Sequence, residues 1–114
     1  MSTTAPPRDP SAYSPSNHFV GHVRDRTDGP DRHLDGDIIR TCIEDGEVRP
    51  HPHDDAKRYF RATVAAVTYR LVANVEQGVV VTGYPLGINP DAARDSGRGS
   101  SRQIEDILAF LRAR

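Results

Sequence analysis

Several arginine and tyrosine residues lie between Arg58 and Pro85, and these side chains are suited to binding phosphate groups. The stretch reads RYFRATVAAVTYRLVANVEQGVVVTGYP, and its period-two alternation predicts three successive β-strands. The apolar set of this alternation contains Phe60, Val67, Tyr69, Leu71, Val75, Val79 and Val81. The other set contains Tyr59, Arg61, Thr68, Arg70, Asn74, Thr82 and Tyr84. An antiparallel sheet that is covered by helices on one side and open on the other accounts for this division.

The polar set contains the side-chain types that metal-free cleavage of RNA requires. That reaction needs activation of a 2′-hydroxyl, neutralisation of charge on the phosphoryl oxygens and a proton for the leaving oxygen. Arginine presents a planar fork of donors to a phosphate, and tyrosine or histidine can transfer protons. On this hypothesis Arg61 and Arg70 hold the phosphate. Tyr84 or His18 transfers a proton, and Tyr59 stacks on a base. The alternative is a solvated sheet face on which arginine and tyrosine pair across strands.

Composition and charge restrict the class of protein. The chain has 114 residues, with 15 basic and 16 acidic side chains and a formal net charge of −1, so it has no general attraction to nucleic acid. Lys57 is the only lysine, and Cys42 is the only cysteine, which excludes a disulfide framework within the chain. No stretch approaches the ~18 apolar residues of a membrane span, and no signal-peptide pattern is present. We therefore expect a cytoplasmic protein with no membrane partner.

Two helical patterns precede the predicted strands. Ser16 or Asn17 can cap a first helix that continues to about Arg26. Asp35 can cap a second helix, which Gly46 is well placed to end. The apolar stripe of this second helix consists of Ile38, Ile39, Cys42 and Ile43.

The remaining patterns complete the order of elements. A first strand is expected from Glu47 to His51, and Gln77-Gly78 is the clearest hairpin turn among the later strands. Ser100 and Gln103 form a capping-box pattern before a helix over residues 101–113. Residues 1–15 are rich in proline, serine and threonine, so we expect a disordered arm there. Residues 16–114 are expected to form one α+β domain, with a flexible loop over 87–100.

This order of elements resembles small toxin-like proteins of the RelE/BrnT-related family. The resemblance covers residues 16–85 and is carried by HFVGHVRDR, LDGDIIRTCIEDGEV, RYFRAT, TYRLVANVE and VVVTGYP. It implies an α+β fold in which two N-terminal helices pack on one face of a curved, three- or four-stranded antiparallel sheet, followed here by a C-terminal helix. It also implies a metal-independent endoribonuclease that acts by 2′-hydroxyl attack on the adjacent phosphate, with RNA or the ribosome and an antitoxin protein as partners.

The resemblance also implies roles for individual residues. His18 matches the histidine of the first helix, and Arg24 and Arg26 match the basic end of that helix. The sheet positions correspond to Arg58 or Arg61, to Arg70 and to Tyr84. The candidate catalytic residues are therefore His18, Arg61, Arg70 and Tyr84. The candidate RNA-binding residues are Arg24, Arg26, Arg58, Tyr59 and Thr82.

No metal or cofactor is expected from these patterns. His18 and His22 lack the glutamate of an HExxH motif, and the HPHDD segment from His51 to Asp55 is typical of an exposed loop. The TDGPDRH insertion between the helices and the tail over 87–114 depart from the family pattern.

A non-enzymatic protein-interaction module is the alternative function. Either the C-terminal helix or the arginine–tyrosine face would then bind a protein. The near-neutral charge and the absence of further lysines favour this alternative, whereas the strand pattern and the resemblance favour the ribonuclease. The sequence does not indicate an oligomeric state.

Overall fold

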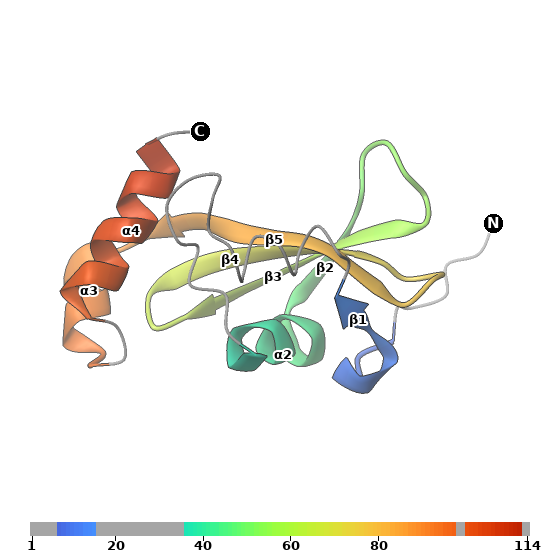
Figure 1. The fold of residues 1–114 in the computed structure, drawn as a ribbon, viewed down its shortest axis with the longest axis horizontal. Coiled ribbons are helices and arrows are strands. Elements are labelled where there is room, and N and C mark those ends of the chain that lie inside the picture. Colours follow the sequence, from blue (N-terminus) through green and yellow to red (C-terminus); the bar gives the residue numbers. More distant parts are fainter. Residues whose placement is uncertain (1–6, 16–35, 98–99, 113–114) are drawn as a thin grey trace.

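A mixed sheet forms the body of the protein, with one helix against a face of the sheet and the C-terminal helices at one end (Figure 1). The computed structural model describes residues 7–15, 36–97 and 100–112. The elements in chain order are the 3-10 helix η1 (Pro10–Ala12), β1 (Ser14–Pro15), α2 (Gly36–Asp45), β2 (Glu47–Pro50), β3 (Lys57–Val64), β4 (Val67–Asn74), β5 (Val79–Ile88), α3 (Pro90–Asp95) and α4 (Ser101–Arg112). The strand order is β1-β5-β4-β3-β2, in which β1 is parallel to β5 and the other neighbours are antiparallel.

The fold is α+β, but the predicted arrangement of two N-terminal helices on a three- or four-stranded antiparallel sheet is wrong. Across the described ranges the sheet has five strands and is mixed, because β1 runs parallel to β5. One long helix of the described residues, α2, precedes β2, and it follows β1 instead of beginning the domain. The helix predicted from Ser16 or Asn17 to Arg26 lies outside the described residues. No sequence pattern indicates β1, since a two-residue strand that contains proline has no detectable periodicity.

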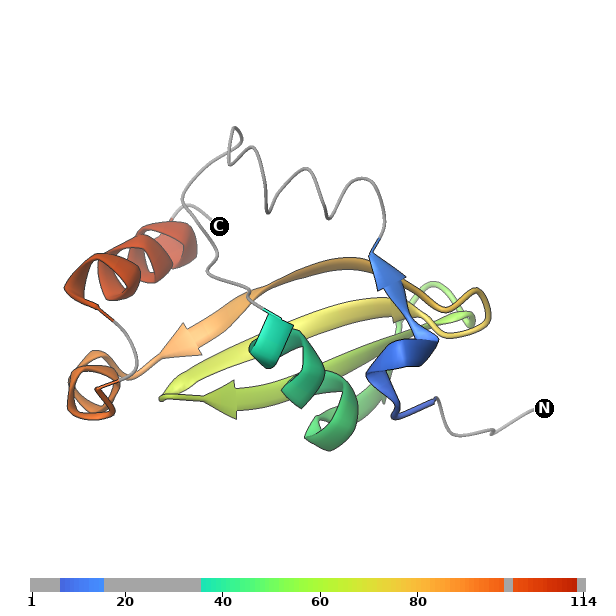
Figure 2. The same ribbon diagram turned by 60° about the horizontal axis from the view of Figure 1, so that its bottom comes forward.

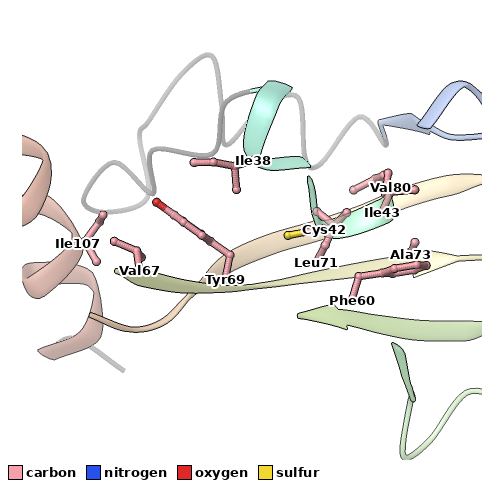
Figure 3. Packing of buried hydrophobic residues seen from close by; sticks show 10 residues of the cluster. All are labelled: Ile38, Cys42, Ile43, Phe60, Val67, Tyr69, Leu71, Ala73, Val80 and Ile107. Atoms are coloured by element: carbon pink, nitrogen blue, oxygen red, sulfur yellow. The ribbon is translucent and has the colours of Figure 1, made fainter. Parts of the chain in front are cut away.

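The core lies between α2 and one face of the sheet. Phe60 of β3 and Leu71 of β4 are opposite each other in the register and are fully buried. Helix α2 packs against these two strands and contributes Ile43 and Cys42, neither of which is exposed. Figure 3 shows this layer, with Ile107 of α4 beside Val67 and Tyr69 at its far end. Burial raises the pKa of the Cys42 thiol to about 11.

Two irregularities in the pairing of β4 with β5 change which residues of β5 face the core. Ala73 pairs with Val80, whereas the preceding residue Val72 pairs with Thr82, so Val81 is an extra residue at a bulge. Val80 is buried, although the alternation in the sequence placed Val79 and Val81 in the apolar set. The bulge restores the alternation for Thr82 and Tyr84, which lie on the opposite face as predicted.

The segment before β1 is attached to the domain by two side chains. Arg8 donates hydrogen bonds to three carbonyl oxygens at the C-terminal end of α2: Ile43 (2.7 Å), Glu44 (3.1 Å) and Gly46 (2.6 Å). The ring of Tyr13 lies edge-on to Phe60, with 6.1 Å between centroids. These contacts give residues 7–15 a defined path, whereas composition predicted a disordered arm over residues 1–15.

The C-terminal part packs at the end of β5. Residues 87–100 were predicted to be a flexible loop, but they include α3, which Asn89 caps by accepting a hydrogen bond from the amide of Ala92 at 3.2 Å. The predicted capping box of α4 is confirmed, because Gln103 N–H donates to Ser100 Oγ (3.2 Å) and Ser100 N–H donates to Gln103 Oε1 (2.8 Å). Figure 2 shows α3 and α4 together at this end of the sheet, away from α2.

Candidate functional site

Four polar residues lie in one row across the face of the sheet opposite to α2. Residues that are directly opposite on neighbouring antiparallel strands project to the same face, with their β-carbons about 5 Å apart. Glu47 of β2 pairs with Arg61 of β3, Arg61 pairs with Arg70 of β4, and Arg70 pairs with Tyr84 of β5. We refer to Glu47, Arg61, Arg70 and Tyr84 as the arginine row. Four consecutive strands therefore place two arginines, a glutamate and a tyrosine side by side on one face.

The neighbouring row on the same face adds aromatic groups. It runs from Arg49 through Tyr59 and Val72 to Thr82. The guanidinium carbon of Arg70 lies 4.2 Å from the centroid of the Tyr59 ring, which is a cation–π contact. The ring of His51 lies 5.3 Å from that of Tyr59. Stacking therefore restricts the guanidinium of Arg70 to one orientation, since a planar cation on a ring has few alternatives.

Arg70 has hydrogen-bonding capacity that the described part of the chain does not use. Its Nε atom is buried and has no hydrogen-bond partner among the described residues. A buried donor without an acceptor is unfavourable, and most buried donors in proteins are paired.

Glu47 is the anion of the arginine row. Its Oε1 accepts a hydrogen bond from Arg49 Nε at 2.8 Å and lies 3.6 Å from Arg61 Nη2. The hydrogen bond and the charge of Arg49, with a smaller effect from Arg61, hold the pKa of Glu47 below its ordinary value. The side chains of Glu47 and Arg61 are 47% and 51% exposed, so a ligand can reach both.

Arg61 and Arg70 are like charges in directly opposite positions, an arrangement that destabilises a sheet by a few tenths of a kcal/mol. Glu47 offsets the charge of Arg61 from one side, and the Tyr59 ring contacts Arg70 from the other. Arg61 therefore has a carboxylate as its neighbour, whereas Arg70 has an aromatic ring.

The structure brings together most of the sheet residues that the sequence singled out. Arg61, Arg70 and Tyr84 share the arginine row, and Tyr59 and Thr82 share the row beside it. Arg58 was predicted to bind RNA, but it does not lie on this face. Arg58 is two residues before Phe60 in β3, so its side chain projects to the same face as Phe60. Its Nη1 donates to the carbonyl oxygens of Asp55 (2.6 Å) and Lys57 (2.8 Å). The candidates His18, Arg24 and Arg26 lie outside the described residues.

Glu47, Arg49 and His51 also belong to this face, although they were not among the site residues predicted from the sequence. Glu47 and Arg49 lie on either side of Val48 in the predicted strand, so alternation alone predicts that their side chains project to the same face. Their proximity to Arg61 and Tyr59 depends on the register of β2 with β3, which alternation alone does not specify.

The rim of this face includes Lys57 and the turn before β3. Lys57 pairs with Asn74 in the register, and its Nζ lies 3.5 Å from Asp54 Oδ2. Asp54 also accepts a hydrogen bond from the amide of Ala56 at 2.9 Å, which lowers the pKa of the Asp54 carboxyl. No group of three or more histidine, cysteine, aspartate or glutamate side chains is placed to hold a metal ion within the described ranges.

No family model matches this chain, and no curated protein or solved structure matches it. The resemblance to RelE/BrnT-related proteins therefore rests on the sequence patterns and stays a prediction. Among the described residues, none of the helices combines the length and the apolar character needed to cross a bilayer.

Proposed function

We propose that the face carrying the arginine row binds the phosphodiester backbone of single-stranded RNA, and that the protein cleaves RNA there without a metal ion. The observation that carries the proposal is the direct pairing of Arg61 with Arg70 and of Arg70 with Tyr84. Two arginines at paired positions on one face can supply donors to an anion with several acceptor oxygens, and phosphate suits the fork geometry of arginine.

Single-stranded RNA fits the surroundings of the row better than a duplex does. Unpaired bases can stack on aromatic side chains, which is a common way in which proteins hold single strands. The ring of Tyr59 lies next to Arg70, and the ring of His51 lies next to that of Tyr59. A backbone phosphate at the arginine row would therefore place a neighbouring base beside an aromatic group.

Each step of the cleavage has a group in the row that can perform it. Arg61 and Arg70 bind the nonbridging oxygens and stabilise the charge that develops on them. The ionised Glu47 accepts the proton of the 2′-hydroxyl, whose oxygen bonds to phosphorus as the bond to the 5′-oxygen breaks. The Tyr84 hydroxyl donates a proton to the leaving 5′-oxygen. The products are a 2′,3′-cyclic phosphate and a 5′-hydroxyl, and proton exchange with water restores both side chains.

The test is cleavage of a fluorescent single-stranded RNA by the purified full chain in the presence of EDTA. We expect products that end in a 2′,3′-cyclic phosphate, and no cleavage of a 2′-O-methyl RNA. Arg70→Ala should lower the rate by about 10²–10³-fold, because it removes one charged donor to the phosphate. Arg40→Ala is the matched control, since Arg40 is an exposed arginine of α2 that pairs with Asp37 at 2.6 Å. Absence of cleavage by the folded wild-type chain would refute the enzymatic proposal.

A protein-interaction module is the second candidate. Helix α4 already packs against β5, and its Ile104 and Ile107 are buried in the domain. This packing leaves the face with the arginine row as the surface for a protein partner. Binding of a partner that depends on Arg61 and Arg70, without cleavage of any RNA, is the result expected for this alternative.

A further inference from the structure

We infer that Glu47 occupies, in the free protein, the position that a ligand phosphate takes between Arg49 and Arg61, and that it competes with the ligand for these two arginines. The inference rests on the proposed binding of RNA to the arginine row. It assigns a second phosphate subsite, formed by Arg49 and Arg61, beside the one formed by Arg61 and Arg70.

The geometry of Glu47 supports this inference. Its Oε1 atom is shared by two guanidinium groups from different strands, with Arg49 Nε at 2.8 Å and Arg61 Nη2 at 3.6 Å. Arginine recognises carboxylate and phosphate by the same parallel donor bonds. The position that holds the Glu47 carboxylate in the free protein is therefore suitable for a phosphate group.

The fold does not depend on this ion pair. The side chains of Arg49 and Glu47 are 66% and 47% exposed, and exposed ion pairs contribute little to stability. The ion pair is consequently free to exchange for a ligand without disturbing the core. Its strength falls as salt is added, as does the attraction of the arginines for phosphate.

Arg61 is the link between the two subsites. It pairs with Glu47 on one side and with Arg70 on the other. A ligand with successive phosphates can contact Arg70, Arg61 and Arg49 across three strands, whereas a single phosphate reaches one subsite only. The site therefore favours a polyanionic chain over a mononucleotide, provided that the Glu47 carboxylate moves aside.

The test measures the affinity of the full chain for a fluorescent 2′-O-methyl RNA, which binds without being cleaved. Glu47→Gln should raise the affinity about fivefold at low salt, as expected for removal of one unit charge about 4 Å from a phosphate. The slope of log affinity against log salt concentration should also become steeper, by about the amount that one additional phosphate contact contributes. Glu105→Gln is the control: Glu105 is an exposed residue of α4, and this substitution should leave the affinity unchanged.

A second variant shows where the gain arises. Arg49→Ala in the Glu47→Gln background should abolish the increase, because it removes half of the second subsite. If the wild-type chain binds the RNA and Glu47→Gln binds it equally or more weakly, the competition is refuted while the proposed function stands. If neither chain binds at low salt, the competition and the proposed function both fail.

Discussion

The turn between β3 and β4 consists of two alanines in a backbone conformation that alanine disfavours. Ala65 and Ala66 have φ angles of 52° and 67°, and they connect the paired residues Val64 and Val67. In this left-handed region the β-carbon approaches the following carbonyl oxygen, which costs about 1–2 kcal/mol per residue. Two-residue hairpin turns with two positive φ angles strongly prefer Asn-Gly for this reason.

Replacing these alanines should therefore stabilise the protein. Ala66→Gly removes the strain of the left-handed conformation at one position, but glycine loses about 0.5–1 kcal/mol more conformational entropy on folding. The free energy of unfolding should therefore rise by about 0.5–1 kcal/mol. The double change Ala65→Asn with Ala66→Gly should gain about 1–2 kcal/mol. The hydrogen bond from Asn89 N–H to the Ala66 carbonyl oxygen, 3.0 Å long, involves backbone atoms and is retained.

Urea denaturation and thermal melting measure the effect. The midpoint in urea should rise without a change in slope, and the melting temperature should rise by roughly 2–4 °C for the single variant. Ala92→Gly is the matched control, because Ala92 is an exposed residue of α3 and the same substitution there should destabilise by up to about 1 kcal/mol. If Ala66→Gly lowers stability as Ala92→Gly does, the explanation by backbone strain is wrong.

Three further predictions concern other parts of the protein. Arg8→Ala should lower the free energy of unfolding by about 1–2 kcal/mol in urea titrations, because it removes the donors to the last carbonyl oxygens of α2; an unchanged midpoint would show that the segment before β1 adds no stability. Burial raises the pKa of Cys42 to about 11, so the unfolded thiol ionises at lower pH than the folded one. The free energy of unfolding should therefore fall as pH rises from about 9 towards 11. Cys42→Ala should reduce this fall in urea titrations over the same pH range. Because Arg49 lowers the pKa of Glu47, cleavage should persist until the pH falls below the ordinary pKa range of a glutamate. Arg49→Ala should move the acid side of the pH–rate profile to higher pH. An unchanged acid side would exclude Glu47 as the proton acceptor.

The local patterns of the sequence predicted several elements because a few adjacent residues determine them. Ser100 and Gln103 satisfy each other's backbone groups, so their spacing alone indicated the start of α4. Gly46 was expected to end α2, and a side chain at this position would collide with the carbonyl oxygen of Cys42. Alternation along β3 and β4 correctly separated Phe60 from its polar neighbours.

Features that depend on contacts between distant residues were not predictable in this way. The strand β1 exists because its backbone pairs with that of β5, and nothing in Ser14-Pro15 shows this. The bulge at Val81 changes the direction of the side chains on β5 without a glycine or proline to mark it. The candidate site depends on register in the same way, since Glu47 becomes part of it only by lying opposite Arg61.

The scarcity of lysine has a practical consequence for experiments on this surface. Lys57 is the only lysine in the chain, and it lies on the rim of the face that carries the arginine row. Amine-directed reagents therefore react at Lys57 and at the amino terminus, and they leave every guanidinium group unmodified. A fluorescent dye attached to Lys57 would sit two residues along β3 from Tyr59, where it could report the arrival of a ligand while the chemistry of the surface stays intact.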